Sequence, residues 1–409
     1  MKTLLISLVS DQTLPNVQLI KEFQKEVDNY LFITTDKMEK KGCRRWIEKA
    51  TNIHNSVSCI VQEFSFDNIT EKLDEIDFTI YNRIIVNLTG GTKITTLSAH
   101  DYFKEMGAEI YYVTGTNNEY IKIFPGRKKL VKQFTNKITI KDYLNSYGFN
   151  SDIPNGSGIN TEYTKKLFNN YQENGFKDYV QALSILRKKR NDGIKNLTKV
   201  DSSVNNFLSS IDFIPSNENI LTKAEVRYLT GEWLEEYVGA VIKEELHLSN
   251  EEILTGVVLE KESLPQETNS VKRLLGDYAP LKEKRPDNEI DVMFTYNNRF
   301  YTVECKTSII DLREVGVNES GEKIVKEVNI LGETIYKADY LKNRFGLFAH
   351  STILTLTDFP GYINASPNVL KNRTKQMEDL INRCSLSGIK LIDGNQIKNE
   401  PSISKLIFQ

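Results

Sequence analysis

Four ionisable residues near the middle of the C-terminal half have types and spacing that suit phosphodiester chemistry: Glu289, Asp291, Glu304 and Lys306. Two runs rich in β-branched and aromatic residues flank Asn297-Asn298, a pair typical of a tight two-residue hairpin turn. Such a turn places Asp291 opposite Glu304, and Glu289 opposite Lys306. Because directly opposed residues share a face of the sheet, all four side chains are predicted to converge.

This convergence needs a physical cause, since two carboxylates about 5 Å apart in a strand pair repel by roughly 3 kcal/mol at an effective dielectric near 20. A divalent cation between them reverses the sign, and carboxylate oxygens suit Mg²⁺ or Mn²⁺. We therefore expect Asp291, Glu304 and Glu289 to bind the metal. Lys306 then positions the attacking water or steadies the phosphate. The alternative is a solvated hairpin face on which Glu289 pairs with Lys306.

A fifth acidic residue, Glu235, lies in a predicted helix over residues 222–246. It sits beside the apolar stripe of that helix, and a carboxylate that points inward needs a partner. Glu235 is thus expected to assist the metal or the water, and a surface glutamate without a role is the alternative. Lys337, in a predicted helix over residues 332–344, is interpreted as a solvated lysine or a contact to phosphate.

A second group of candidate residues follows two predicted strands near the N-terminus. Ser10-Asp11-Gln12-Thr13 follows the first, and Asn87-Leu88-Thr89-Gly90-Gly91-Thr92-Lys93 joins a later strand to a helix. Ligands of open α/β sheets bind beyond the carboxyl ends of the strands, and a helix start with a lysine favours anions. The spacing fits neither a Walker A loop nor Gly-x-Gly-x-x-Gly. The alternative is a tight turn with a solvated lysine.

Apolar strand-like runs alternate with amphipathic runs through the first 125 residues, which predicts a mostly parallel sheet with helices on both faces. Predicted strands cover 4–9, 31–34, 57–61, 83–88, 109–114 and 119–124, and predicted helices cover 17–30, 37–50, 69–76 and 92–106.

Turn-forming residues between 150 and 160 predict a domain boundary. Helices are expected over 139–147 and 163–190, in a segment that reads either as a winged-helix-like module or as a helical spacer. Strands over 253–259 and 352–357 flank the motif hairpin, and 311–329 reads as a flexible loop or an extra hairpin. The predicted domains are 1–135, 136–220 and 221–409.

The composition is that of an ordinary globular protein: 409 residues, 39% hydrophobic and 26% charged, with a net charge of −2. This charge gives no global footprint for nucleic acid, so any such ligand must bind locally. The four cysteines are scattered and argue against a zinc site or a disulfide framework. The apolar start is interpreted as a strand, and no apolar run is long enough for a bilayer. We expect a cytoplasmic protein without a membrane partner.

Asp291 followed by Glu304-Cys305-Lys306 resembles the catalytic core of the PD-(D/E)xK nucleases, whose fold is restriction-endonuclease-like. Gly231-x-x-x-Glu235 resembles the first-helix acid of the same enzymes. The sequence departs from the pattern in that Pro286-Asp287 lies four residues before Asp291. By this resemblance the catalytic residues are Glu289, Asp291, Glu304, Lys306 and Glu235.

The run Asn-x-Thr-Gly-Gly-Thr-Lys after a hydrophobic strand resembles the ligand loop of CRISPR-associated Rossmann fold (CARF) receptors, over about the first 130 residues. The resemblance implies a homodimer that binds a cyclic oligoadenylate across its twofold axis. The implied contacts are Ser10, Asp11, Gln12, Thr13, Asn87, Thr89, Gly90, Gly91, Thr92 and Lys93.

Together the two resemblances imply an α/β protein with an N-terminal Rossmann-like CARF domain, a helical connector and a C-terminal restriction-endonuclease-like domain. Such a protein is similar to the ancillary nucleases of type III CRISPR antiviral defence. The implied activity is metal-dependent cleavage of DNA or RNA, allosterically activated by cyclic tetra-adenylate. Two other interpretations remain open: a non-catalytic nucleotide-responsive DNA-binding regulator, and a restriction or repair nuclease that no nucleotide controls.

Overall fold

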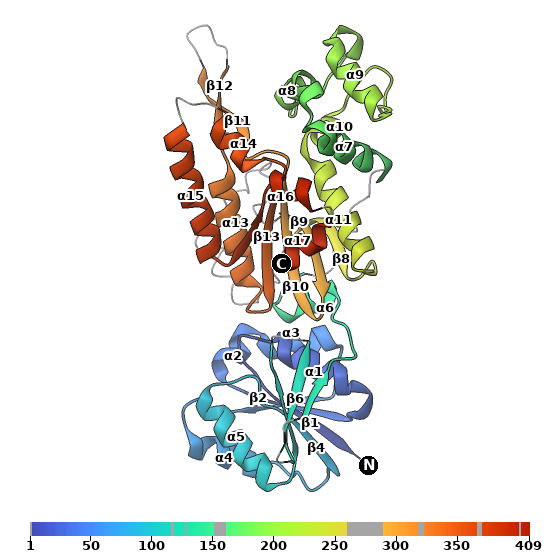
Figure 1. Ribbon diagram of the computed structural model, residues 1–409. Coiled ribbons are helices and arrows are strands. Elements are labelled where there is room, and N and C mark those ends of the chain that lie inside the picture. The colour runs from blue at the N-terminus through green and yellow to red at the C-terminus, as the bar shows by residue number, and fades with distance from the viewer. Residues whose placement is uncertain are drawn as a thin grey trace, which may run out of the picture.

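The computed structural model describes residues 2–115, 118–126, 128, 130–150, 161–259, 289–317, 323–365, 370–400 and 402–409. Figure 1 shows two halves, each built on a sheet, stacked along the long axis of the molecule, with a group of helices at the far end of the C-terminal half. Among the described residues, no helix combines the length and apolarity needed to cross a bilayer.

The N-terminal sheet has seven strands in the order β3-β2-β1-β4-β5-β6-β7. Strands β1 to β5 are parallel, and β6 and β7 extend one edge in antiparallel fashion. The bounds are β1 Thr3–Leu8, β2 Asn29–Thr34, β3 Ser56–Ile60, β4 Arg83–Asn87, β5 Glu109–Val113, β6 Glu119–Phe124 and β7 Leu130–Gln133. Every residue of β1 is buried, as expected for a strand covered on both faces.

Helices cover both faces of this sheet, which confirms the predicted layering (Figure 1). One face packs against α1, α3 and α6, and the other packs against α4 and α5. The bounds are α1 Leu14–Phe23, α2 Asp36–Lys41, α3 Cys43–Thr51, α4 Phe66–Asp74, α5 Lys93–Glu105 and α6 Ile140–Ser146, with a 3-10 turn η1 at Gln24–Glu26.

Two predicted helices of this half were wrong in extent. The helix expected to reach Tyr30 ends at Phe23, and Tyr30 is a buried residue of β2. The helix expected over residues 37–50 is two helices, because Gly42 has a left-handed φ of 87° between α2 and α3. Strand β7 was missed, since it has only four residues and its apolar pair, Leu130 and Val131, follows a basic run that reads as a connector.

The C-terminal sheet has five strands in the order β14-β13-β10-β9-β8. Strands β10, β13 and β14 are parallel, while β8 and β9 are antiparallel to their neighbours. A separate hairpin, β11–β12, confirms the hairpin alternative for residues 311–329. The bounds are β8 Ile253–Val258, β9 Glu289–Tyr296, β10 Arg299–Lys306, β11 Ile310–Val317, β12 Lys323–Asn329, β13 Ala349–Thr355 and β14 Ile389–Ile392.

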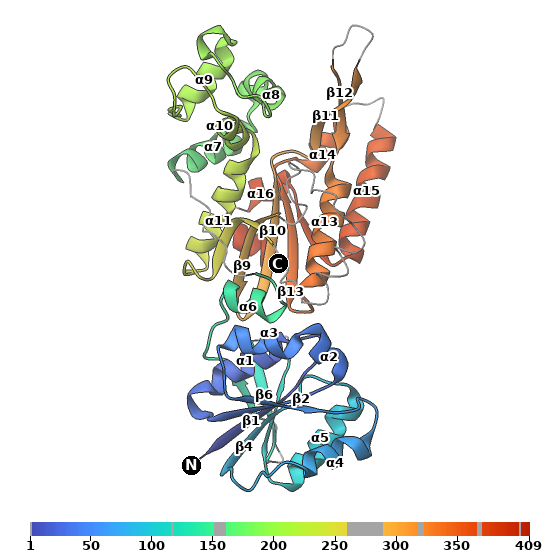
Figure 2. The same ribbon diagram turned by 180° about the vertical axis from the view of Figure 1, so that it is seen from behind.

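Helices pack on both faces of the C-terminal sheet. Figures 1 and 2 show α13 and α15 on one side and α11 on the other, where α17 also packs. The bounds are α11 Trp233–Glu245, α13 Leu331–Arg344, α14 Phe359–Asn364, α15 Leu370–Leu386, α16 Gly394–Asn399 and α17 Ile403–Phe408.

The segment between the sheets is helical, and it shares a hydrophobic core with α11 and the C-terminal sheet. The helix expected over 163–190 is broken, because Gly175 and Phe176 both have left-handed φ angles. The helix expected over 222–246 contains a π-helical turn, η4. The bounds are α7 Thr161–Asn174, η2 Lys177–Tyr179, α8 Val180–Lys188, η3 Leu197–Lys199, α9 Ser202–Ser210, α10 Lys223–Arg227 and η4 Tyr228–Glu232. The predicted boundary at 151–160 and Pro286-Asp287 lie outside the described residues.

Candidate active site and ligand loops

From the turn to Val292 and Val303 the β9–β10 hairpin has the register that the sequence predicts, but the ladder ends there and includes neither predicted pair, Asp291–Glu304 or Glu289–Lys306. Tyr296 pairs with Arg299 across the turn, and the pairs continue to Val292 and Val303. Asn297 and Asn298 have φ angles of 49° and 56°, as a tight primed turn requires. The four ionisable residues therefore lie at the open end of the hairpin.

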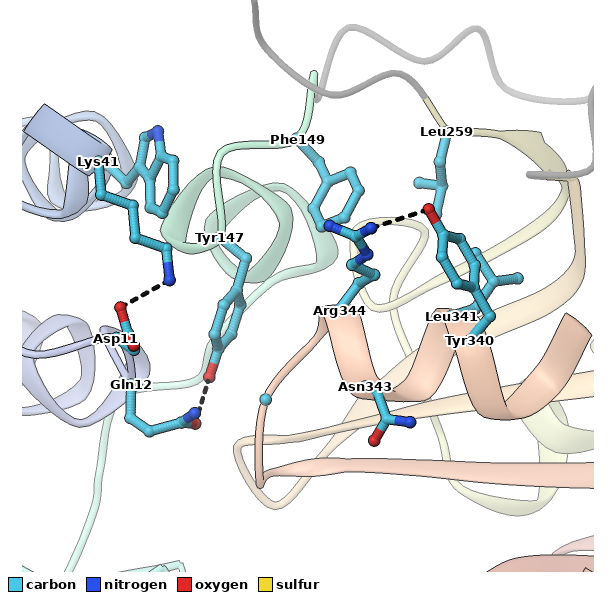
Figure 3. A pocket seen from close by; sticks show the side chains of 12 residues that line it. Asp11, Gln12, Lys41, Tyr147, Phe149, Leu259, Tyr340, Leu341, Asn343 and Arg344 are labelled. Carbon is cyan, nitrogen blue, oxygen red and sulfur yellow. Dashed lines mark hydrogen bonds and ion pairs between the residues drawn. The ribbon is translucent and has the colours of Figure 1, made fainter. Parts of the chain in front are cut away.

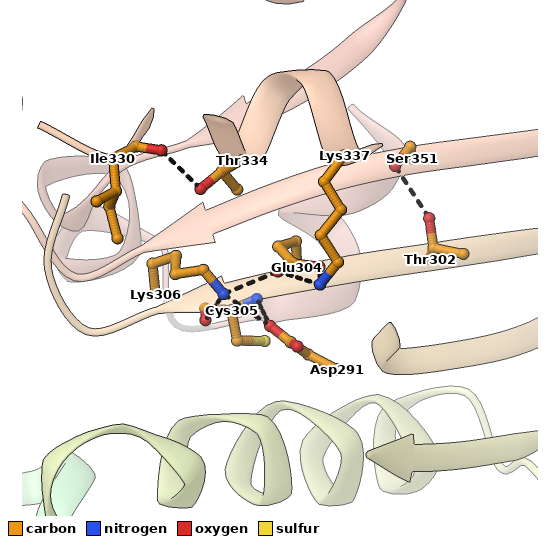
Figure 4. Close-up of polar contacts among 9 residues, drawn as sticks. All are labelled: Asp291, Thr302, Glu304, Cys305, Lys306, Ile330, Thr334, Lys337 and Ser351. Carbon is orange, nitrogen blue, oxygen red and sulfur yellow. Dashed lines mark hydrogen bonds and ion pairs between the residues drawn. The ribbon is translucent and has the colours of Figure 1, made fainter. Parts of the chain in front are cut away.

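Asp291, Glu304 and Lys306 meet there, as Figure 4 shows. The Lys306 ammonium donates to Asp291 Oδ2 at 3.2 Å and to Glu304 Oε1 at 2.8 Å. Asp291 Oδ2 also accepts from the backbone N–H of Cys305 at 2.7 Å. The two carboxylates thus point to the same place and share one cation, and both are more than nine-tenths buried.

Lys337 of α13 is a member of this cluster. Its ammonium donates to both oxygens of Glu304, at 2.7 and 2.8 Å (Figure 4). The interpretation of Lys337 as a solvated lysine was therefore wrong. Helical position alone shows that Lys337 faces the sheet side of α13, but only the parallel pairing of β10 with β13 places that side over Glu304.

The electrostatics of the cluster follow from burial and from the two ammonium groups. Burial and then the charge of Glu304 raise the pKa of Asp291. Burial would also raise the pKa of Glu304, but Lys306 and Lys337 outweigh it and lower that pKa below its usual value. Burial opposes the charge on Lys306, but the two carboxylates outweigh that effect and raise its pKa. Lys306 is therefore a permanent cation at neutral pH.

Glu235 reaches the same cluster from α11. Burial, and then the charge of Asp291, raise the pKa of Glu235 to about 9. Lys306 opposes this shift, and Glu289 adds to it. Glu289 is half-buried at the start of β9 and acts on Glu235 through its charge. The structure thus brings all five predicted catalytic residues into one electrostatic neighbourhood, with Asp291, Glu304 and Lys306 in direct contact.

The donor set fits a hard divalent cation. Two buried carboxylates at one point, with raised pKa values at Asp291 and Glu235, mark a site with more negative charge than its lysines balance. Mg²⁺ is commonly bound through one or two carboxylates, with water and phosphate oxygens completing its shell. Within the described part of the chain, no group of three or more His, Cys, Asp or Glu side chains is placed to hold a metal by itself.

The two predicted ligand loops lie side by side, because β1 and β4 are adjacent parallel strands. Gly90 shows how closely they approach: a Cβ there would lie 2.1 Å from the carbonyl oxygen of Leu8. Gly91 has a φ of 80°, which suits glycine. Thr92 is the N-cap of α5 and accepts from the N–H of Thr95 at 3.2 Å. The loop thus presents a helix start, the feature expected of an anion site.

Several of the predicted ligand contacts hold the loops in shape. Asn87 is fully buried, donates to Asn16 Oδ1 at 2.8 Å and accepts from the Thr89 hydroxyl at 2.6 Å. Thr13 is fully buried and donates to the carbonyl of Ser146. In contrast, Gly91 and Lys93 are exposed. The side chains of Asn87, Thr89 and Thr13 are therefore structural, which the sequence pattern could not distinguish from ligand contacts.

Asp11 and Gln12 lie at the junction between the two halves, and the Ser10 hydroxyl donates to Gln12 O at 3.4 Å. Asp11 pairs with Lys41 at 2.6 Å, and Gln12 Oε1 accepts from the backbone N–H of Leu347 at 3.0 Å. Both line a cavity of about 460 Å³, shown in Figure 3, whose far wall is α13. The cavity is lined by Asp11, Gln12, Lys41, Trp46, Tyr147, Phe149, Leu259, Tyr340, Leu341, Asn343, Arg344 and Gly346.

The turn of the β9–β10 hairpin is anchored in the N-terminal half. Asn298 is 5% exposed, and its Oδ1 accepts from the backbone N–H of Ile138 at 2.7 Å. Its Nδ2 donates to Asn136 O at 3.0 Å, and its backbone oxygen accepts from Gln18 at 3.0 Å. The sequence marks Asn298 only as a turn former, so this contact was missed. One hairpin therefore joins the N-terminal half to the carboxylate cluster.

Residues 4–143 match a family model described as the Card1 CARF domain. The N-terminal sheet is a Rossmann-like CARF sheet. The match covers about a third of the chain and includes both ligand loops. No curated protein matches the sequence.

Two solved structures are similar over nearly the whole chain. Can2 from Sulfobacillus thermosulfidooxidans, solved in complex with cyclic tetra-adenylate, superposes with a TM-score of 0.66 at 20% identity, covering 99% of this chain and 97% of that one. Protein VC1899 from Vibrio cholerae superposes with a TM-score of 0.67 at 17% identity, covering 97% and 95%. These proteins share the fold of both halves and the order in which they are joined.

Proposed function

We propose that this chain is a cyclic oligoadenylate-activated, metal-dependent endonuclease of type III CRISPR defence. In this proposal residues 1–135 are the CARF sensor, 136–220 a helical connector and 221–409 a PD-(D/E)xK nuclease domain. The match of residues 4–143 to a CARF domain supports the sensor. The observation that carries the nuclease is that Lys306 bonds both Asp291 and Glu304 at the open end of one hairpin.

Asp291 and Glu304 would hold Mg²⁺ or Mn²⁺, with Glu289 and Glu235 close enough to assist. When bound, the ion supplies Lewis-acid polarisation of the phosphate and lowers the pKa of water. The substrate class is a phosphodiester in DNA or RNA, because the remaining positions around such an ion suit phosphate oxygens.

Lys306 acts in this mechanism as a fixed positive charge. Its raised pKa excludes a role as general base at neutral pH. Its ammonium is placed to orient water beside Asp291 or to offset charge that develops on the phosphate oxygens. Lys337 holds Glu304 in position through both carboxylate oxygens.

The activator would bind at the two ligand loops of a homodimer, on the exposed Gly91 and Lys93 and the helix start at Thr92. Cyclic tetra-adenylate is the activator of choice, since the Can2 structure contains it. A ligand can change activity only if it favours one arrangement of the protein over another. The contacts of Gln12 and Asn298 with the other half are the means by which that preference would reach the nuclease.

A cleavage assay with variants of each site tests the proposal. Labelled DNA and RNA are incubated with Mn²⁺, with and without cyclic tetra-adenylate. Wild type is expected to cut only with activator. Lys93→Ala should need about tenfold or more activator, because a charge contact to phosphate is lost. Lys104→Ala, an exposed lysine on the same helix, is the matched control.

Glu304→Gln should lower cleavage by about 100-fold or more while activator binding and the melting temperature stay near the wild-type values. Wild-type cleavage that is the same with and without any cyclic oligoadenylate would refute the sensor. Activator binding without cleavage of any nucleic acid would instead favour a non-catalytic regulator.

A further inference from the structure

The end of α8 carries four consecutive cations: Arg187, Lys188, Lys189 and Arg190. Within the described part of the chain, none of the four forms an ion pair with a carboxylate. Cations near a helix C-terminus are favoured by the helix dipole, but that partial charge is only about half an elementary charge. The cluster therefore has a surplus of positive charge.

Arg190 lies against the helix that carries Glu235. A Cβ on Gly231 would lie 3.5 Å from Arg190 Nη2, an ordinary contact distance, so the guanidinium lies beside this helix at Gly231. Gly231 is in the π-helical turn η4, a feature often found at functional sites. Glu235 lies four residues later, which places it on the same side of this continuous helix.

The turn η4 also contacts the end of the catalytic strand. The hydroxyl of Thr307 donates to the carbonyl of Thr230 at 3.0 Å. Thr230 is the neighbour of Gly231 in sequence, and Thr307 is the neighbour of Lys306. A short chain of contacts, from Arg190 to Gly231 and from Thr230 to Thr307, therefore connects Arg190 with the catalytic lysine. The contact of Thr230 with Thr307 thus fixes the cations of α8 relative to the active site.

Arg187 lies in the last turn of α8, and Arg190 lies just past the end of this helix, where its backbone N–H donates to Arg187 O at 3.3 Å. Desolvation and the charge of Arg190 lower the pKa of Arg187, and Asp311 of β11 opposes this shift. Strand β11 starts shortly after Lys306, and Figure 2 shows α8 on the side of its helical group that faces β11. Both arginines therefore border the same region as the carboxylate cluster.

We propose that Arg187 and Arg190 form a phosphate clamp that holds the nucleic-acid backbone beside the active site. This inference rests on the proposed function. A guanidinium binds a phosphate through two parallel N–H donors. The backbone hydrogen bond from Arg190 to Arg187 keeps the two arginines together at the end of α8. A phosphodiester chain bound there offsets the surplus charge. The arginines are positioning residues for the substrate and do not act on the scissile bond.

Binding measured against salt concentration tests the clamp. Fluorescent single-stranded DNA and RNA are titrated with the full-length protein by anisotropy, with cyclic tetra-adenylate and with chelator to prevent cleavage. Arg187→Ala/Arg190→Ala should lower affinity by about tenfold or more and reduce the slope of log K against log salt by about 1.4, or 0.7 for each lost phosphate contact. Under cleavage conditions KM should rise with little change in kcat.

Two further variants separate this role from a structural one. Lys195→Ala/Lys199→Ala removes two exposed positive charges from the same helical segment and should leave the salt slope unchanged. Arg187→Lys/Arg190→Lys should restore the salt slope, because both positive charges are present. It should restore only part of the affinity, because lysine lacks the planar guanidinium that binds phosphate through two N–H donors.

The possible outcomes distinguish the clamp from the nuclease assignment. If wild type cuts nucleic acid and the double alanine variant binds with an unchanged salt slope, the clamp is refuted and the nuclease stands. If binding depends on the arginines but Mn²⁺ and every activator fail to produce cleavage, the clamp stands and the nuclease does not. If wild type binds no nucleic acid, both are refuted.

Discussion

At the residue scale, Glu235 shows that the carboxylate cluster is under electrostatic strain. Burial and Asp291, Glu289 and Glu232 all favour its protonated form, and only Lys306 opposes them. A carboxyl that stays protonated near neutral pH in the folded chain, and ionises in the unfolded chain, costs stability as the pH rises. The cluster thus has more negative charge than the nearby lysines neutralise.

Glu235→Gln should remove this pH dependence. The folded-state pKa of about 9 lies above the ordinary 4.5. The stabilisation that this difference provides is therefore complete below pH 4.5, declines as the pH rises, and is lost above about pH 9. The free energy of unfolding of wild type should fall relative to Glu235→Gln by up to about 1.4 kcal/mol per pH unit within this window. Urea unfolding in chelator between pH 5 and 8 measures the difference.

Glu244→Gln, on an exposed residue of the same helix, is the control and should follow wild type at every pH. Parallel curves for wild type and Glu235→Gln would mean that Glu235 is ionised in the folded protein, and its assignment to the cluster would have to be withdrawn.

At the scale of elements, the carboxylate cluster depends on how closely α11 approaches the sheet. Gly239 makes that approach possible, because a Cβ there would lie 2.6 Å from Thr255 Cγ2 of β8. Threonine is β-branched and has little rotamer freedom with which to move aside. Glu235 lies one turn earlier on the same helix, so the distance between α11 and β8 also sets where its carboxyl sits.

Gly239→Val should therefore overpack this contact, lower the free energy of unfolding by about 1–3 kcal/mol, and reduce cleavage in the folded fraction. Gly332→Ala is the matched control, since a Cβ there meets Leu380 at an ordinary 3.5 Å. Chemical denaturation and activity per folded molecule are the measurements. An unchanged stability for Gly239→Val would show that α11 is free to move away from the sheet.

The sequence predicts elements well where one signal determines them. The β9–β10 register follows from Asn297-Asn298 and the alternation around it, and the loops after β1 and β4 meet because parallel neighbours end at one edge. The predicted helices were too long at Gly42 and Gly175. At both positions a residue with a left-handed φ interrupts the helix, although the apolar residues recur with helical spacing before and after it. A helical period by itself does not show such a break.

The site was less predictable than the hairpin that carries it. Lys337 is 31 residues from Lys306 in sequence, and only the pairing of β10 with β13 brings α13 over Glu304. Asn87 and Thr89 are polar residues of the kind that bind ligands, yet their side chains form hydrogen bonds within the protein that hold the loops in shape. Residue type predicts which groups can bind, whereas tertiary contacts decide which groups are still free to do so.

At the scale of the whole molecule, two elements run from the junction of the halves to the carboxylate cluster. The β9–β10 hairpin has Asn298 at the junction and Asp291 at its other end. Helix α13 carries Lys337, which donates to Glu304, and in the turn that follows this helix the backbone N–H of Leu347 donates to Gln12 Oε1. Tyr143 strengthens this junction, since its hydroxyl donates to Phe345 O at 2.8 Å and its ring stacks on Phe300. In the proposed function, these two elements are the route by which a shift at the ligand loops would reach the carboxylate cluster.

Asn298→Ala should weaken this transmission without changing either site. The variant leaves the buried N–H of Ile138 without its acceptor, which costs about 1–3 kcal/mol at the junction and loosens the hairpin turn from the N-terminal half. Asn297→Ala is the matched control: Asn297 has a similar left-handed φ in the same turn but is exposed. The strain of alanine at such a φ is therefore common to both variants, and the buried contact alone differs.

Activator affinity by calorimetry should match wild type in both. The ratio of cleavage rates with and without cyclic tetra-adenylate should fall several-fold for Asn298→Ala only, and an equal fall in the two variants would place the coupling elsewhere than this contact.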